Sequence, residues 1–184
     1  MAINSTKHIN RTKTISSVED LVNALHQSKK EKFGEIITRL DVLKLDVDEL
    51  STWSKDCYTR NCLECNDDFE LILICWEEGQ VTPIHDHGGE ECWVKIIQGE
   101  FKETIYESNE SGEPTEIKTN IGGPGGISYM VDFMGCHSLE NVSNGRALTI
   151  HLYAKPIASC NIYNNEDGQF EPKVMEYDTV KCLV

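Results

Sequence analysis

Residues 83–99, PIHDHGGEECWVKIIQG, place two histidines one residue apart in a stretch that otherwise has the composition of a β-strand. Alternate side chains of a strand share one face, so His85 and His87 point the same way. Cys92 follows after four intervening residues, where a third metal ligand could stand. The stretch is compatible with a zinc site that has a thiolate ligand, an iron site without an acidic ligand, or a polar turn of a β-protein.

Length and charge limit the possible classes of protein. The chain has 184 residues, which suits one domain with a hydrophobic core better than two. Its net charge of −14 argues against nucleic acid and anionic membranes as partners. No run approaches the roughly 18 apolar residues of a membrane span, and the polar N-terminus lacks the apolar stretch of a signal peptide. We expect a soluble, cytoplasmic protein.

Eight cysteines in an intracellular chain of this size indicate mainly reduced thiols. Cys62 and Cys65 form a C-x-x-C pattern, but a structural zinc site needs two further ligands, and no second C-x-x-C or H-x-x-x-H follows. We interpret this pair as two loop thiols. Cys75 lies in the apolar run LILICW and is interpreted as core packing.

The first third of the chain has the pattern of helices. Apolar residues fall on one helical face over residues 18–25 and again over 33–40. Ser17, three residues before Asp20, resembles the start of a capping box. A third short helix is expected to begin near Asp46. We therefore predict that residues 16–56 are helical and that residues 1–15 are flexible.

From about residue 69 the chain consists of short runs rich in β-branched and aromatic residues. Glycine-rich and polar turns separate them, notably GGPGG at 122–126 and SNG at 143–145. Many short strands with regular turns indicate a sandwich or a barrel. We expect one all-β domain over residues 1–184, with a small β-barrel over 57–184 after the helical segment.

The spacing around the histidine pair resembles the first motif of the cupins, which are small jelly-roll β-barrels with a metal inside. Over residues 79–99 it reads G-x5-H-x-H-x4-C-x6-G, and Cys92 takes the place of the usual glutamate ligand. His137, followed after three residues by Asn141, resembles the second motif, with Asp132 near the position of the usual proline. The chain thus supplies three imidazoles and replaces the acid by a thiol.

The three imidazoles favour particular chemistry. Neutral ligands leave the full charge on a divalent ion, which suits a substrate that brings an anionic ligand. Three nitrogens on one side of an octahedral ion also leave three positions open, two for a chelating substrate and one for dioxygen. Cys92 could instead bind the ion and complete a zinc-like site. The residues alone leave both possibilities open.

The chain resembles the thiol dioxygenases of the cupin superfamily, specifically the arginine-type cysteine dioxygenases. The resemblance runs from about residue 17 to 175 and is densest in YTRN (58–61), LICWEEGQVTPIHDHGGEECWVKIIQGEFKETIY (73–106), GCHSLENVS (135–143) and LTIHLYAKP (148–156). It implies an Fe(II) cofactor and conversion of L-cysteine and dioxygen to L-cysteine sulfinic acid, in cysteine catabolism and taurine biosynthesis. We expect the protein to act as a monomer.

The resemblance also implies which residues bind the metal and the substrate. His85, His87 and His137 match the family's three iron ligands. Arg60 matches the residue that pairs with the substrate carboxylate, and Tyr58 matches a tyrosine that supports the same carboxylate. A guanidinium suits this task because it is always charged and can bind two oxygens at once.

Further matches surround the pocket. Cys92 and Tyr153 match a pair that forms a thioether crosslink, which holds the phenol hydroxyl near the iron. His151 matches a histidine that hydrogen-bonds this tyrosine, and Thr149 stands where the family commonly has serine. The remaining matched positions are the pocket residue Trp76, Cys160 near the mouth, and Met175 as a lid residue.

The chain departs from the family at two places. Cys136 precedes His137 and should point away from the metal as its strand neighbour. Lys155 lies in Ala154-Lys155-Pro156, where the family often has Ser-Pro-Pro. Two other functions remain open, a dioxygenase of another small thiol such as 3-mercaptopropionate and a non-catalytic cupin that binds metal. Arg60 favours cysteine, because enzymes for 3-mercaptopropionate usually carry glutamine at its position.

Overall fold

The computed structural model describes residues 13–181, so most of the segment expected to be flexible lies outside the described residues. The elements follow one another as α1 (Val18–His26), η1 (Lys30–Lys32), α2 (Phe33–Thr38), η2 (Asp48–Leu50), β1 (Thr59–Cys65), β2 (Glu70–Trp76), β3 (Cys92–Gln98), β4 (Phe101–Ser108), β5 (Pro114–Gly122), β6 (Ile127–Met130), η3 (Asp132–Met134), β7 (Cys136–Asn141), β8 (Ala147–Tyr153), β9 (Ser159–Asn164), β10 (Gln169–Val174) and β11 (Thr179–Val180). None of the helices within residues 13–181 is long and apolar enough to span a membrane.

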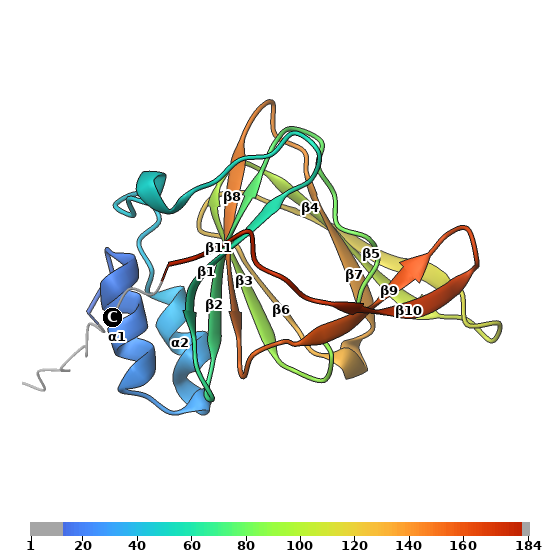
Figure 1. Cartoon of the computed structure of the whole chain (residues 1–184), viewed down its shortest axis with the longest axis horizontal. Helices are drawn as coiled ribbons and strands as arrows, with labels where there is room; N and C mark the ends of the chain where they lie inside the picture. The colour runs from blue at the N-terminus through green and yellow to red at the C-terminus, as the bar shows by residue number, and fades with distance from the viewer. Residues whose placement is uncertain (1–12, 182–184) are drawn as a thin grey trace, which may run out of the picture.

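Two layers of strands face each other (Figure 1). One is a six-stranded sheet in the order β11-β1-β2-β8-β3-β6, and the other contains β5-β4-β7 and the hairpin β10-β9. Residues 81–85 close the gap in the second layer, because isolated bridges join Val81 to Glu140, His85 to His137 and His85 to Ile162. The expected all-β jelly roll with an N-terminal helical segment is confirmed.

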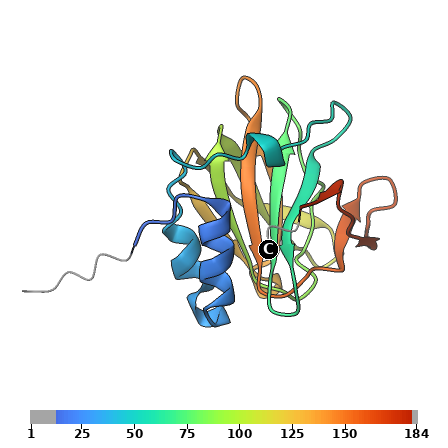
Figure 2. The ribbon, with the colours of Figure 1, turned by 60° about the vertical axis from the view of Figure 1, so that its left-hand side comes forward.

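The central strands β2 and β8 of the six-stranded sheet are buried on both faces. All seven residues of β8 are buried. Leu148, Ile150 and Leu152 belong to the core formed with the helices, so the alternating residues Thr149, His151 and Tyr153 face the barrel interior. Figure 2 shows α1 and α2 lying against the outer face of the sheet. The buried strands therefore read as continuous apolar runs and not as an alternating pattern.

The helical segment matches its sequence pattern in part. Ser17 caps α1, since its hydroxyl accepts a hydrogen bond from the Asp20 backbone N–H at 3.0 Å. The second helix ends at Thr38, and the third is a single turn at Asp48–Leu50. Gly34 lets α2 approach the sheet closely, because a Cβ there would lie 2.9 Å from Nε1 of Trp93. The short helix η1, turns and irregular connections make up the rest of residues 16–56.

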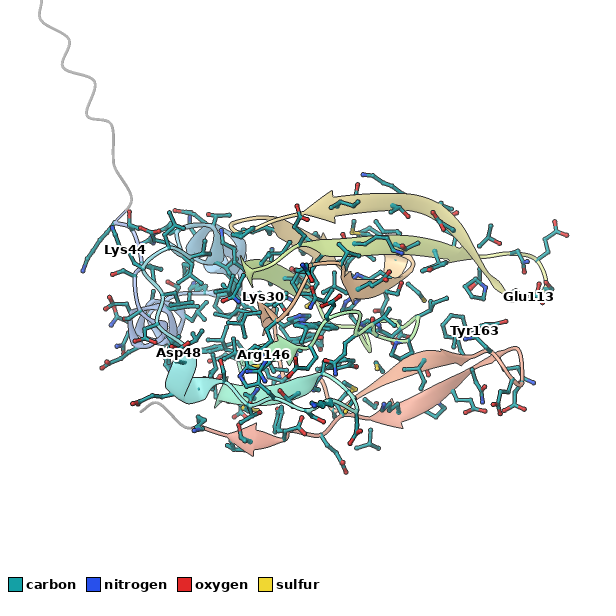
Figure 3. The ribbon with its side chains drawn as sticks, turned by 90° about the horizontal axis from the view of Figure 1, so that it is seen from above. Lys30, Lys44, Asp48, Glu113, Arg146 and Tyr163 are labelled. Atoms are coloured by element: carbon teal, nitrogen blue, oxygen red, sulfur yellow. The ribbon has the colours of Figure 1, made fainter. Side chains whose placement is uncertain are left out.

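The molecule is elongated, with the helices at one end. Seen from above, the tips of the hairpins β4–β5 and β9–β10 lie at the other end, marked by Glu113 and Tyr163 (Figure 3). The barrel interior between these ends is the place where His85, His87 and His137 come together. The chain that runs from β8 through β9 and β10 to β11 crosses the front of the barrel in the view of Figure 1.

Lys155, directly after β8, has a φ of 122°, and it is the one non-glycine residue with positive φ within residues 13–181. Side chains of L-residues rarely occupy this region, because the Cβ crowds the backbone. Lys155 is exposed, so packing of its own side chain does not compensate for the strain. The surrounding loop must hold the conformation.

We predict that Lys155→Gly stabilises the protein by about 1 kcal/mol, because glycine adopts positive φ without a steric cost. Urea unfolding of the variant and of the wild type measures the difference. Lys155→Ala is the matched control, since it removes the same side chain but keeps the Cβ, and it should give no gain. Destabilisation by the glycine variant would contradict the claim of strain.

Candidate metal centre

The three histidines of the sequence motifs meet in the barrel interior. His85 and His137 form an antiparallel bridge in which each backbone N–H donates to the other's carbonyl at 3.0 Å. Residues directly opposite each other in such a pair present their side chains on the same face, and His87, two residues further along, faces the same way. One nitrogen from each ring lies within 4.8 Å of those of the other two. One ion can therefore contact all three.

Hydrogen bonds orient two of the rings. Nδ1 of His85 lies 2.9 Å from the Pro83 carbonyl oxygen, and Nδ1 of His137 lies 2.8 Å from Oε1 of Glu103. Both oxygens accept, so each Nδ1 carries the proton and each Nε2 keeps a free lone pair. Glu103 also accepts a hydrogen bond from the Ser128 hydroxyl at 2.6 Å. A carboxylate behind a histidine is the usual support of a metal ligand.

The electrostatic environment keeps His85 and His87 neutral. Burial, together with the neighbouring His137, lowers the pKa of His85 to about 3 and also lowers the pKa of His87. Burial alone raises the pKa of Glu103, but the hydrogen bonds from His137 and Ser128 outweigh it, so the pKa is lowered and the carboxylate is ionised. Neutral rings bind a cation at neutral pH without first losing a proton.

The residues present fit a metal ion. His87 is 1% exposed, and its Nδ1 is buried without a hydrogen-bond partner within residues 13–181. An unpaired buried polar atom costs free energy, and a bound cation would give this imidazole a partner. Three neutral nitrogen donors without a carboxylate suit iron, zinc, copper or nickel rather than magnesium or calcium.

Two aspartates fix the loop that carries the histidines. Asp132, on η3, accepts hydrogen bonds from the backbone N–H groups of His87 at 2.9 Å and Gly89 at 2.5 Å. Asp86 accepts from the backbone of Gly88 at 3.1 Å and of Asn161 at 2.8 Å. Sequence reasoning noted Asp132 only as a replacement for a proline and did not single out Asp86 or Glu103.

Cys92 lies outside the histidine group. It stands directly opposite Tyr153 across β3 and β8. In the neighbouring pair, the Ala154 backbone N–H donates to the Glu91 carbonyl. Hydrogen-bonded and non-hydrogen-bonded pairs alternate along antiparallel strands, so Cys92 and Tyr153 form a non-hydrogen-bonded pair, in which the side chains lie closest together. Burial raises the pKa of both side chains, so the thiol and the phenol stay protonated. The alternative of a zinc-like site with Cys92 as a ligand is therefore not favoured.

A chain of hydrogen bonds runs along the interior face of β8. Nε1 of Trp76 donates to Oγ1 of Thr149 at 3.0 Å, and Oγ1 of Thr149 lies 3.0 Å from Nε2 of His151. Because the threonine oxygen accepts from the indole, its own proton is available for Nε2. His151 thus has Thr149 as its partner, and no hydrogen bond joins it to Tyr153 within residues 13–181, although their rings stack at 6.5 Å.

Arg60 is a buried cation with an unused donor. It is 8% exposed, and its Nε donates to the Glu176 carbonyl at 3.1 Å. Its Nη2 is buried and has no hydrogen-bond partner, and no ion pair involves Arg60 within residues 13–181. A buried charge without a partner is costly, so this group is arranged for an anion.

The guanidinium shares one pocket with His85. Its lining includes Arg60, Tyr58, His85, Tyr153 and His151. Tyr58 stacks on Trp76 with ring centroids 4.7 Å apart, and burial raises its pKa, so its hydroxyl stays protonated and can donate. A second cavity of about 410 Å³, lined on the outside by residues 173–178, also reaches Arg60 and Tyr58. Arg60 thus stands between the interior and the surface.

The other matched residues are placed as follows. Cys160 and Met175 line the pocket, with Sγ and Sδ 3.4 Å apart. Cys136 is half-buried opposite Tyr106 and lines neither cavity next to Arg60. Cys62 and Cys65 lie on β1 and not in a loop, so that interpretation was wrong. The described residues give them no place in a metal-binding group.

The chain is similar to known proteins over most of its length. A family model described as cysteine dioxygenase type I matches residues 3–166. Cysteine dioxygenase type 1 of Danio rerio is 28% identical over 172 residues, covering 88% of this chain and 86% of that protein. The corresponding protein of Homo sapiens is 28% identical over 171 residues, with the same coverage. Oxalate decarboxylase of Lactobacillus farciminis in complex with formate, at a TM-score of 0.50 and 12% identity over 70% of this chain and 34% of that chain, is similar in fold alone.

We predict that Glu103→Ala weakens binding of a divalent ion about 10- to 100-fold, because His137 loses the carboxylate that orients it. Anaerobic titration with Co(II), followed by absorbance, measures the affinity and the stoichiometry. Glu107→Ala, at an exposed position of the same strand, is the control and should bind as the wild type does. Equal affinity of both variants would remove the role of Glu103.

Proposed function

Because the chain belongs to the cysteine dioxygenase type I family, we propose that it is an Fe(II)-dependent thiol dioxygenase that converts L-cysteine and dioxygen to L-cysteine sulfinic acid. The observation that carries the proposal is Nη2 of Arg60, which is buried without a hydrogen-bond partner within residues 13–181 and belongs to a residue lining the same pocket as His85. A small molecule with a carboxylate at one end and a metal-binding thiol at the other satisfies both features. Cysteine has this form.

His85, His87 and His137 would hold the iron. A ferrous ion supplies open coordination positions and the redox chemistry that dioxygen needs before it reacts with a closed-shell thiolate. The reaction balances without an external reductant, since a thiol and dioxygen together contain all the atoms of a sulfinic acid. The sulfur supplies the four electrons that reduce dioxygen.

Arg60 and Tyr58 bind and orient the substrate in this proposal. The carboxylate of cysteine would meet the unpaired Nη2 and so remove the cost of a buried, unpaired cation. The Tyr58 hydroxyl adds a second donor. Because the carboxylate is fixed at Arg60, in the pocket that His85 also lines, the thiol at the other end of the substrate is directed toward the histidines. This lowers the entropic barrier to reaction.

Tyr153 would act near the histidines, where the substrate thiol reacts. Burial holds its hydroxyl in the protonated form, so it can donate a hydrogen bond to an oxygen or a sulfur that becomes negative during the reaction. A thioether to Cys92 would fix the phenol in place. Ile74, Ile157 and Ile162 line the same pocket and limit the entry of water, which strengthens these polar contacts.

The thioether would form by oxidative coupling of neighbouring side chains. The Cys92 sulfur bonds to a ring carbon of Tyr153, and the thiol hydrogen and the ring hydrogen leave. Two electrons and two protons pass to an oxidant, for which dioxygen is available to this enzyme. Location in the cytoplasm and a monomeric state remain predictions from sequence.

Oxygen consumption by the Fe(II)-reconstituted protein tests the proposal directly. Addition of L-cysteine should start oxygen uptake, and cysteine sulfinate should accumulate in a 1:1 ratio to oxygen. 3-Mercaptopropionate, which keeps the carboxylate but lacks the amine, should react more slowly. Faster turnover of 3-mercaptopropionate would point to a dioxygenase of that thiol. Metal binding without oxygen uptake for any of these thiols would indicate a non-catalytic cupin.

We predict that Arg60→Ala raises the KM for cysteine about 100-fold, because the substrate carboxylate loses its charged partner. Initial rates of oxygen uptake measure the change. Arg146→Ala, which removes an exposed arginine paired with Glu77, is the control. Turnover of cysteamine, which has no carboxylate, should differ little between Arg60→Ala and the wild type. An unchanged KM for cysteine would remove the role of Arg60.

We predict that a fraction of the purified protein is lighter by about 2 Da, because the coupling of Cys92 to Tyr153 releases two hydrogen atoms. Intact-mass spectrometry and peptide mapping under reducing conditions detect it. Cys92→Ala should abolish the lighter species and retain part of the activity, whereas Cys160→Ala should keep the species. A crosslink found between any other pair of residues would contradict the assignment.

A further inference from the structure

Glu70 is a buried acid to which the proposed mechanism assigns no part. It begins β2 and is 0% exposed, and the rest of the strand, LILICW, is apolar. Burying a carboxylate costs several kcal/mol unless hydrogen bonds compensate it. The partners of Glu70 therefore show what its position achieves.

The carboxylate binds two segments that lie far apart in the sequence. Oε2 accepts a hydrogen bond from the Ile157 backbone N–H at 3.1 Å. Oε1 accepts a hydrogen bond from the Tyr177 hydroxyl. One oxygen thus serves the loop after β8, and the other serves the C-terminal strap, which we define as residues 174–178.

Both segments frame the pocket. Ile157, from the loop, and Met175, from the strap, line it. The loop also contains Lys155 with its φ of 122°, a conformation that the contact from Ile157 to Glu70 helps to hold. Figure 1 shows the chain between β10 and β11 crossing the side of the barrel next to β1.

The strap sets the position of the arginine. The Glu176 carbonyl accepts from Nε of Arg60 at 3.1 Å. Asp178 accepts from the Arg60 backbone N–H at 2.7 Å and donates its own N–H to the Arg60 carbonyl at 2.8 Å. Tyr177 stands between these two residues, so its bond to Glu70 fixes the strap where it meets the guanidinium.

Glu70 is itself held by the sheet. In the register of β2, β8 and β3, it pairs with Tyr153, which pairs in turn with Cys92. Paired residues of antiparallel strands share a face, so the carboxylate lies in one row with the tyrosine and the cysteine. The contact to both segments of the pocket frame thus comes from a residue of a buried strand, which is a rigid support.

We propose that Glu70 is a positioning residue that fixes both walls of the substrate pocket, and that through Tyr177 it holds Arg60 with Nη2 free for a carboxylate. The effect on substrate rests on the proposed function. The connection between the two segments does not, and it can be tested in the absence of turnover.

Hydrogen exchange of the full-length protein, read by mass spectrometry in peptides covering 154–159 and 174–179, tests the connection. Glu70→Ala should speed exchange in both peptides about tenfold or more, because hydrogen bonds to a charged acceptor are lost. Tyr177→Phe should speed exchange only in 174–179. Glu70→Gln should stay within about threefold of the wild type, since its amide can accept from Ile157 and donate to Tyr177.

Matched controls separate this effect from a general loss of stability. Glu171→Ala removes an exposed acid of β10, and Tyr163→Phe removes a hydroxyl that makes no hydrogen bond within residues 13–181. Neither should change exchange in either peptide. If Glu70→Ala does not fold, Tyr177→Phe and Glu70→Gln still decide the question.

Kinetics test the consequence for substrate. Tyr177→Phe should raise the KM for cysteine about tenfold and leave kcat within about threefold, because binding of the carboxylate is weakened and the reacting groups are untouched. Unchanged exchange in both peptides for Glu70→Ala and Tyr177→Phe would overturn the proposal, as would an unchanged KM. If the wild type does not oxidise cysteine, the proposed function fails and exchange alone decides the role of Glu70.

Discussion

The pair of backbone hydrogen bonds between His85 and His137 is the contact on which the site depends. It places two imidazoles opposite each other on one face and fixes the position of His87 two residues further along. The segment 81–85 lies between β7 and β9 and is joined to them by isolated bridges and not by a continuous ladder. A slip of one residue would turn His85 to the opposite face of the sheet, so Asp86 and Asp132, which bind the loop backbone, protect the register.

Successive side chains of a strand point to opposite faces, so the six-stranded sheet has one face that packs against the helices and one that faces the barrel interior. On β8, Ile150 and its alternate neighbours pack against the helices, while Thr149, His151 and Tyr153 point into the barrel. The helices therefore stabilise the pocket without touching it. Side chains that must be held accurately thus stand on a strand buried from both sides, a more rigid support than a loop.

Helices, strands and motifs in which residues recur at a regular spacing could be predicted from sequence. Elements that depart from such a spacing could not. The histidine motif, the apolar stripes of α1 and α2, and most strands follow directly from residue spacing. β10 contains Pro172, a residue that usually argues against a strand; it is tolerated since β10 pairs with β9 and leaves its other edge free. The C-x-x-C was assigned to a loop, yet pairing with β2 makes it a strand.

The buried acids were missed for a related reason. Glu70 and Glu103 read as ordinary charges of a strongly acidic chain, but each occupies an interior-facing position of a strand, next to buried apolar residues. An acidic residue at the start of, or within, an apolar strand was the signal that could have indicated a buried carboxylate. Their partners, Tyr177 and His137, come from distant parts of the sequence, and only the fold brings them together.

The account joins a metal site to Nη2 of Arg60, which has no hydrogen-bond partner within residues 13–181, and a crystal structure tests this most directly. Crystals of the Fe(II)-loaded protein, grown with L-cysteine in the absence of dioxygen, should show one ion about 2.0–2.2 Å from the three imidazoles. The cysteine carboxylate should lie about 2.7–3.2 Å from Nη2 of Arg60, with its sulfur directed at the ion. An ion bound elsewhere, or a carboxylate that does not reach Arg60, would contradict the account.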